Sequence, residues 1–184
     1  ADLAFTMHML SWLAVDGVAA IVEFPGVLYR GGAEARIRKY LVDNNYVDAV
    51  IQLPPDLFFG TTIGTCIIVL KKAKKDNAVL FVDASNKFVR QGNKNKLSPE
   101  NQEAILGMLQ ERADVDYTAA LVDAERIVDN GYNLSVSAYV EAEDTREVID
   151  IAELNARIRR IVTHQEELRA GIDKIVADLE GDEK

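Results

Sequence analysis

Two adjacent aromatic residues in a glycine-containing loop are the side chains of this sequence best suited to meet a flat ligand. Phe58 and Phe59 precede Gly60, in a segment that starts with Leu53-Pro54-Pro55-Asp56 and leads into an apolar run. A phenyl ring at the mouth of a strand pair can stack on a nucleic-acid base that has left its duplex. The alternative is structural, with one phenylalanine in the core and the other partly exposed.

A basic segment follows further along the chain, between residues 85 and 96. It contains Lys87, Arg90, Lys94 and Lys96, together with three asparagines and no acidic residue. The segment has no hydrophobic period, so we expect a loop rather than a regular element. The simplest interpretation of such a loop is a solvated surface segment.

Residues for other kinds of chemistry are sparse. The single cysteine, Cys66, lies in an apolar run, as expected for a reduced core residue of a cytoplasmic protein. His8 and His164 are distant from it and from each other, so zinc-ligand spacing is absent and no Ser-His-Asp or Cys-His set can be assembled. The sequence also lacks a Walker-type loop and a Gly-x-Gly-x-x-Gly motif after a strand. We therefore predict no metal site and no catalytic residue of these classes.

Charge is distributed unevenly along the chain, whose net charge is −9. Residues 1–97 carry 12 Lys and Arg against 9 Asp and Glu, whereas residues 98–184 carry 9 against 21. The second part is expected to contact something other than a phosphate backbone. No stretch approaches the ~20 apolar residues of a membrane span, so no membrane partner is expected.

The elements that would position the aromatic and basic residues alternate between extended and helical patterns. We expect strands at residues 18–22, 47–53, 65–70 and 78–83. We expect helices at residues 3–13, 33–45 and 98–112, the last capped by Ser98 with Pro99 in its first turn. The first strand is apolar throughout and is predicted to be buried on both faces. The pattern predicts an α/β sheet, and the close succession of the last two strands predicts antiparallel pairing at one edge.

The C-terminal segment has the clearest periodicity of the sequence. Apolar residues recur at alternating spacings of three and four, interrupted by one polar position, Gln165. They are Ile151, Leu154, Ile158, Ile161, Leu168, Ile172, Ile175 and Leu179. This heptad pattern predicts one long helix with a narrow apolar seam. Such a seam requires a partner helix, either from the same chain or from another one.

The motifs of the chain, taken in order, resemble the second half of the catalytic domain of adenine-specific DNA methyltransferases. The methylation subunit of type I restriction-modification systems is the most similar group. The resemblance rests on residues 17–22, 25–32, 37–41, 50–54, 58–61, 67–72 and 80–85, on Gly131-Tyr132-Asn133-Leu134 with Tyr139, and on the closing heptad helix. Each motif alone is weak, but together they cover nearly the whole chain in a consistent order.

The resemblance implies a fold and a reaction. The fold is the second half of a Rossmann-like methyltransferase sheet with an antiparallel edge hairpin, followed by a helical C-terminal region. The family binds S-adenosylmethionine in a glycine-containing loop after the first strand, and an Asn-Pro-Pro-Phe/Tyr motif holds the flipped adenine. Here Pro54-Pro55 follow Leu53 and precede Asp56, so they are not that motif. We expect both functional elements upstream of Ala1, which leaves no catalytic residue in this chain and an inactive fragment.

The resemblance also assigns functions along the chain. Phe58 matches the ring that stacks on the flipped base, with Phe59 as the alternative if the register differs by one, and the four basic residues of 85–96 would hold DNA phosphates. Residues 1–97 would be the catalytic half-domain, 98–147 a helical or irregular extension, and 148–184 the association helix. The expected partners are double-stranded DNA and the specificity and restriction subunits of a type I complex. A second hypothesis is a module that docks the specificity subunit, or dimerises, without catalysis.

Overall fold

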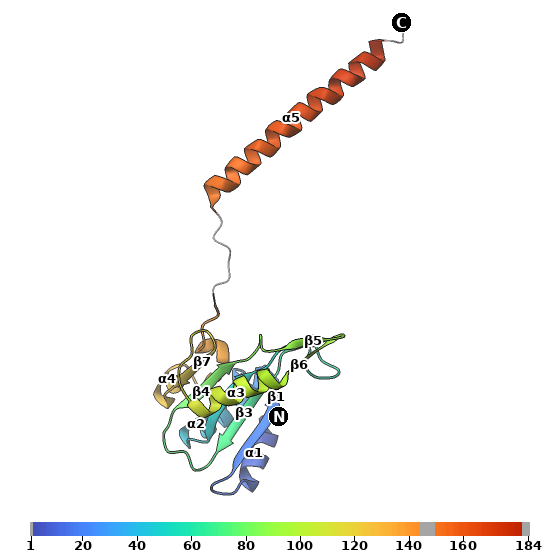
Figure 1. The fold of residues 1–184 in the computed structure, drawn as a ribbon. Helices are drawn as coiled ribbons and strands as arrows, with labels where there is room; N and C mark the ends of the chain where they lie inside the picture. The colour runs from blue at the N-terminus through green and yellow to red at the C-terminus, as the bar shows by residue number, and fades with distance from the viewer. Residues whose placement is uncertain (1, 144–149, 182–184) are drawn as a thin grey trace. The chain divides into compact units, whose positions relative to one another are not determined.

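The chain divides into two compact units, residues 1–143 and residues 144–184 (Figure 1). The structure is a computed structural model and describes residues 2–143 and 150–181. The helices are α1 (Asp2–Trp12), α2 (Ala33–Asp43), α3 (Pro99–Glu111), α4 (Ala124–Asp129) and α5 (Ile151–Gly181), with short 3-10 helices η1 (Pro25–Leu28) and η2 (Val136–Ala138). The strands are β1 (Val18–Glu23), β2 (Val47–Gln52), β3 (Cys66–Lys71), β4 (Val79–Asp83), β5 (Val89–Gln91), β6 (Lys94–Lys96) and β7 (Ala119–Val122).

A five-stranded mixed sheet with the order β1-β3-β2-β4-β7 forms the centre of the first unit. β3 is antiparallel to both of its neighbours, β1 and β2, while β2 and β4 are parallel. β1, β2 and β4 therefore point in the same direction. β3 lies between β1 and β2 and points in the opposite direction. The expected α/β class with an antiparallel edge is confirmed.

The strand pairing within that edge differs from the prediction. β3 and β4 follow one another closely in sequence but do not pair, because β2 lies between them. A short connection between two strands favours a hairpin, but the two strands cannot pair when a third strand lies between them. Here β2 lies between β3 and β4 and pairs with β4 in parallel.

Helices cover both faces of the sheet. One core cluster joins α1, α2, α4 and the short 3-10 helices to alternate residues of β2, β3 and β4, such as Val50, Ile68 and Phe81. A second cluster packs α3, through Ile105, against the opposite residues of β2 and β4, such as Ile51 and Leu80. Every residue from Val47 to Ile51 is buried, as expected for a strand that is covered on both sides.

The prediction that residues 18–22 are buried on both faces is wrong. β1 is an edge strand that alternates between exposed and half-buried residues, with Val18 58% and Val22 46% exposed. An apolar sequence does not show where a strand lies in its sheet, and the sheet order places β1 at an edge. Cys66, in contrast, is buried as expected, and burial raises the pKa of its thiol to about 12.

The expectation that residues 85–96 form a loop is also wrong, because β5 and β6 form a two-stranded antiparallel sheet of their own. Most residues of these two strands are polar and exposed, so the strands have no hydrophobic period that would predict them. The signal was the two-residue connection Gly92-Asn93, in which Gly92 has φ +60°. The short elements β7 and α4 were missed as well.

The predicted helix at residues 98–112 is confirmed as α3. Ser98 accepts a hydrogen bond from the backbone N of Asn101 at 3.3 Å and caps the helix, and Pro99 opens its first turn.

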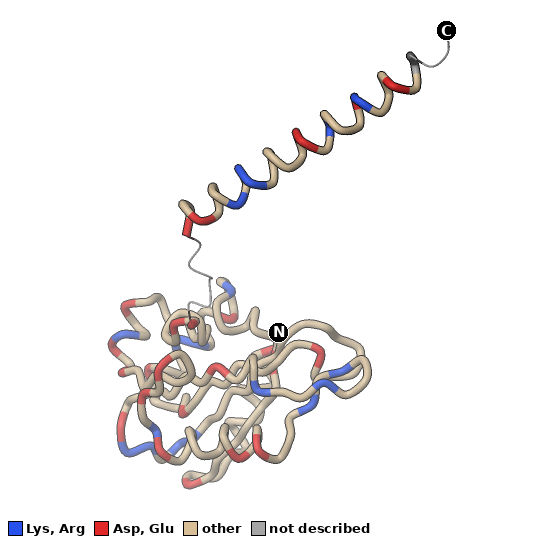
Figure 2. The backbone as a smooth tube through the Cα atoms, turned by 45° about the horizontal axis from the view of Figure 1, so that its top comes forward, with Lys and Arg blue, Asp and Glu red and all other residues tan. Residues whose placement is uncertain are grey.

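The long C-terminal helix, α5, is present as the heptad pattern predicts. It has 31 residues, a length of about 46 Å at ~1.5 Å per residue. Its seam residues are exposed, from Leu154 at 45% to Ile151 at 71%. Charged residues of both signs follow the helix along its length (Figure 2). Among residues 2–143 and 150–181, no helix combines the length and apolar character that a membrane crossing requires.

Candidate nucleic-acid base site

The site lies where three strands of common direction end. β1 ends at Glu23, β2 at Gln52 and β4 at Asp83, and β2 and β4 pair so that Gln52 faces Asp83. In open α/β sheets, ligands bind in the crevice outside the carboxyl ends of the strands. The loops that follow these strands carry Phe24, the aromatic pair Phe58 and Phe59, and the β5–β6 hairpin, respectively.

A pocket of about 550 Å³ opens between the end of β1 and the loop that follows β2. Four phenylalanines line it: Phe5 from α1, Phe24 from the loop after β1, and the pair Phe58 and Phe59. The exposed fraction is 73% for Phe5, 50% for Phe24, 38% for Phe58 and 101% for Phe59. Neither ring of the predicted pair lies in the core. The structure therefore presents two phenyl faces to solvent next to two further rings.

Two polar residues, Glu23 and Thr65, also line the same pocket. Glu23 accepts a hydrogen bond from the Thr6 hydroxyl at 3.1 Å, and partial burial raises the pKa of its carboxyl group. The hydroxyl oxygen of Thr65, a residue only 4% exposed, is buried and has no hydrogen-bond partner among the described residues. A buried hydroxyl without a partner costs stability unless a ligand, a water molecule or another segment supplies one.

Sequence reasoning missed Phe5, Phe24, Glu23 and Thr65 as site residues. One signal was available, because Phe24 directly follows a strand and precedes the breaker Pro25-Gly26. Its relation to Phe58 depends on the sheet order, which places the ends of β1 and β2 on either side of β3.

The basic residues of 85–96 have two different environments. Lys94 donates hydrogen bonds to the carbonyl oxygens of Phe58 and Thr61, and Arg90 lies 3.4 Å from a carboxylate oxygen of Asp56. These two side chains contact the aromatic loop directly. Lys96 is exposed and Lys87 half-buried, and both lie at the base of the same hairpin. Among the described residues, no group of His, Cys, Asp and Glu is arranged to hold a metal ion.

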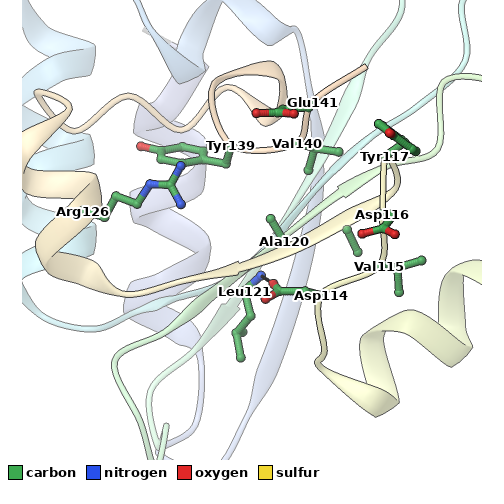
Figure 3. A pocket seen from close by; sticks show the side chains of 11 residues that line it. Asp114, Val115, Asp116, Tyr117, Ala120, Leu121, Arg126, Tyr139, Val140 and Glu141 are labelled. Atoms are coloured by element: carbon green, nitrogen blue, oxygen red, sulfur yellow. Dashed lines mark hydrogen bonds between the residues drawn. The ribbon is translucent and has the colours of Figure 1, made fainter. Parts of the chain in front are cut away.

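A second pocket, of about 390 Å³, lies next to β7, the strand at the opposite edge of the sheet from β1 (Figure 3). Asp114, Asp116 and Glu141 surround it, with Arg126 5.7 Å from the ring centre of Tyr139. Tyr139 itself packs on Phe81 at 4.3 Å between ring centres and donates a hydrogen bond to the carbonyl of Asn133. The acidic rim and the structural role of Tyr139 make this pocket a poor match for an anionic polymer.

Comparison with protein families gives one match that covers most of the chain. Residues 1–148 match the model described as N-6 DNA Methylase. The chain belongs to this family. The match begins ahead of β1 and includes the aromatic loop and the hairpin, so all the residues of the pocket lie within it.

Curated relatives and solved structures agree with the family. The chain is 47% identical, over 183 residues, to the type I restriction enzyme MpnII methylase subunit of Mycoplasma pneumoniae, covering 99% of this chain and 34% of the relative. It is 44% identical to a type I methyltransferase subunit from Streptococcus thermophilus, with a TM-score of 0.75 over 77% of this chain and 30% of that one. A subunit solved in a study of complex assembly of the type I system shares the fold, with a TM-score of 0.59 at 20% identity, covering 94% of this chain and 39% of that one. The chain thus spans about one third of the length of this Mycoplasma pneumoniae relative.

Proposed function

We propose that the chain is the C-terminal part of the methylation subunit of a type I restriction-modification system, a DNA adenine methyltransferase. In this function, the loop with Phe58 and Phe59 stacks on the adenine that leaves the duplex. One observation carries the proposal: two exposed phenyl rings lie at the carboxyl edge of the sheet in a pocket with two further rings. An extruded base loses its stacking partners, and aromatic side chains replace them.

The basic hairpin supports a contact with the DNA backbone next to this pocket. Lys87 and Lys96 are the members of the predicted set best placed for phosphate contacts, since Arg90 and Lys94 contact the aromatic loop. Phosphate contacts fix the register of the protein on the duplex but carry no sequence information. We therefore expect the choice of sequence to reside in the specificity subunit.

The cofactor of the proposed reaction is S-adenosylmethionine, which supplies the methyl group. The described residues do not provide the glycine-containing loop after a first strand that the resemblance implies for it. β1 pairs only with β3 among the described strands, and its outer edge and Val18 and Val22 are exposed. An upstream segment that adds the cofactor-binding strands at this edge would cover both, so we derive no catalytic step from this chain alone.

The proposal is tested with the full-length subunit bound to its specificity subunit. Phe58→Ala and Phe59→Ala are compared in methyl transfer to a duplex with one recognition site. We expect at least one of the two to reduce the rate about 10-fold or more, because stacking is worth about 1–3 kcal/mol per base. Tyr117→Ala, at the far side of the sheet, is the control, since Tyr117 is also exposed, at 54%. If both phenylalanine variants methylate at the control rate, the base-stacking proposal is wrong.

A second function, docking of a partner through α5, is favoured by the exposed seam of that helix. The seam holds eight apolar residues and Gln165 over four heptads, and its apolar side chains are exposed. A long amphipathic helix obtains most of its stability from packing of its apolar face. We propose that this seam binds the helices of the specificity subunit and so joins the methylation subunit to the complex, which includes the restriction subunit.

A charge placed in the seam tests this second proposal. Ile158→Asp with Leu168→Asp should reduce copurification of the specificity subunit at least 10-fold, because the carboxylates would have to be desolvated between helices. Ala156→Asp with Ala170→Asp introduces the same charge on the opposite face of α5 and should leave copurification unchanged. Equal loss with both pairs would point to net charge rather than the seam, and no loss with either would contradict the docking proposal.

A further inference from the structure

The loop that carries the aromatic pair is fastened at its tip by a single ammonium group. Nζ of Lys94 donates hydrogen bonds to the carbonyl oxygens of Phe58 at 3.1 Å and Thr61 at 3.0 Å. These two carbonyls flank Phe59 and Gly60, and Gly60 has φ +83°, which closes the turn between them. One side chain thus bridges both ends of the tight turn on which Phe59 is mounted.

The start of the same loop is fastened by the next residue of the hairpin. Asn95 is only 5% exposed, and its Nδ2 donates to the carbonyl oxygen of Pro55 at 2.7 Å. Its backbone N donates to the carbonyl oxygen of Asp56 at 3.0 Å, and Asp56 has φ +55°. A non-glycine residue in the left-handed region is strained and persists only where its surroundings hold it.

A third side chain connects these two attachments. Nη1 of Arg90 donates to Oδ1 of Asn95 at 3.0 Å and lies 3.4 Å from Oδ2 of Asp56. Oδ1 of Asp56 is in turn 4.0 Å from Nζ of Lys94. The hairpin therefore contacts the loop through its backbone, through a buried amide and through two cations around one carboxylate. In Figure 1, β5 and β6 project beyond the main sheet.

The ring of Phe59 receives no such support from packing, because its side chain is fully exposed. The backbone of the turn therefore fixes the point from which the ring projects. We propose that the β5–β6 hairpin acts as a clamp that positions the aromatic loop, with Lys94 and Asn95 as positioning residues for base stacking. This rests on the proposed function of Phe58 and Phe59. A fixed backbone limits the positions that the ring can take before the base arrives, which reduces the entropy lost on binding.

The clamp differs from the role that the sequence suggests for Lys94, a contact with a DNA phosphate. A lysine that neutralises a phosphate releases counterions on binding, so its removal lowers the salt dependence of DNA affinity by about one unit of slope. A positioning lysine leaves that slope unchanged and instead affects the step that follows binding. The two roles therefore predict different results for the same substitution.

The first test measures the clamp in the chain itself, by 15N relaxation of the amides of residues 57–62. Lys94→Gln and Asn95→Ala should lower the order parameters of this loop from the range of a rigid backbone, about 0.85, to below about 0.6. Lys96→Gln, on the same hairpin, should not change them, and Lys94→Arg should restore them because a guanidinium can also donate to two carbonyls. Unchanged order in both Lys94→Gln and Asn95→Ala would overturn the clamp. If Asn95→Ala fails to fold, the Lys94 pair of variants decides alone.

The second test uses the full-length subunit with its specificity subunit and a duplex with 2-aminopurine at the target adenine. Lys94→Gln should reduce kcat about 10-fold or more and alter the fluorescence of the extruded base, since misplacing a positioned group by about 1 Å can cost 100-fold. The salt slope of DNA binding should stay unchanged, whereas Lys96→Gln should lower it. A lower slope for Lys94→Gln with unchanged kcat would overturn the clamp in favour of a phosphate contact. If loop order falls as expected but Phe58→Ala and Phe59→Ala both methylate normally, the clamp stands as structure and the base-stacking function fails.

Discussion

At the scale of single residues, a buried guanidinium joins segments that are far apart in the sequence. Arg38 of α2 is only 3% exposed. Its Nε donates to the carbonyl oxygen of Tyr132 at 2.9 Å, and its Nη1 donates to those of Val27 at 2.8 Å and Arg30 at 2.7 Å. The planar fork of an arginine suits such divergent acceptors, which a lysine could not all reach. Arg38 thereby connects α2 with η1 and with the turn after α4.

Replacement of this guanidinium should destabilise the fold. Arg38→Met keeps an unbranched apolar side chain but leaves three carbonyl oxygens without their donor, so we expect a loss of about 3 kcal/mol in the free energy of unfolding. Arg36→Met, on the exposed side of the same helix, should change it by less than about 0.5 kcal/mol. Urea denaturation measures both, and similar midpoints for the two variants would contradict the role of Arg38.

At the scale of elements, one buried carboxylate ties the start of β2 to the end of β3 and to the C-terminus of α3. Asp48 is 5% exposed and lies 2.7 Å from Nζ of Lys71 and 2.9 Å from Nη1 of Arg112. Arg112 also donates to the carbonyl oxygen of Ala78 ahead of β4. This network lies at the opposite end of β2 from the aromatic loop. It fixes α3 on its face of the sheet without contributing to the site.

Two aspartates with equally short lysine contacts provide a matched comparison for this network. Asp43 contacts Lys39 at 2.7 Å, but both side chains are about half exposed. Asp48→Ala should cost about 3 kcal/mol, since it leaves two cations partly buried without their partner. Asp43→Ala should cost much less, because water screens an exposed pair. Thermal and urea denaturation of the two variants check the difference, and equal losses would show that burial does not matter here.

At the scale of the whole molecule, the chain consists of a folded unit with its own core and a helix whose described side chains are exposed. Among the residues that the structure describes, all buried hydrophobic ones lie between Leu3 and Val140. The net charge divides at a different place, because residues 1–97, which include the aromatic loop, carry 12 Lys and Arg against 9 Asp and Glu, whereas residues 98–184 carry 9 against 21. The first unit carries the pocket lined by phenylalanines, and the second carries the exposed apolar seam of α5.

This organisation predicts that the first unit does not need α5 for stability. A chain that ends at Glu143 should melt within about 2 °C of the full chain, because it keeps every buried hydrophobic residue among the described ones. Loss of copurification with the specificity subunit should accompany the truncation. The melting temperature is followed by circular dichroism at 222 nm after correction for the missing helix. A large fall in the melting temperature would show that α5 stabilises the first unit.

Local sequence patterns were sufficient to predict several strands and helices of this protein. Apolar runs located β2, β3 and β4, the Ser98-Pro99 signal located α3, and the heptad located α5, because each of these features depends on residues close in sequence. The order of motifs also identified the family. The hairpin could have been predicted from Gly92-Asn93, but its polar strands hid it from a search for hydrophobic period.

The sheet order and the composition of the site were decided only by the tertiary structure. The sequence of residues 18–22 does not show that β1 lies at an edge, because that position depends on which strands pair with it, and β3 is its neighbour in the described sheet. Phe58 and Phe59 were candidates from the sequence, but Phe5 and Phe24 join them only because α1 and β1 bring distant residues to the same end of the sheet. The sequence likewise shows Lys94 as one more cation in a basic segment. Its contact with the turn at Phe59 exists because β4 places the hairpin beside the loop after β2, and such long-range packing is not encoded in any short stretch of chain.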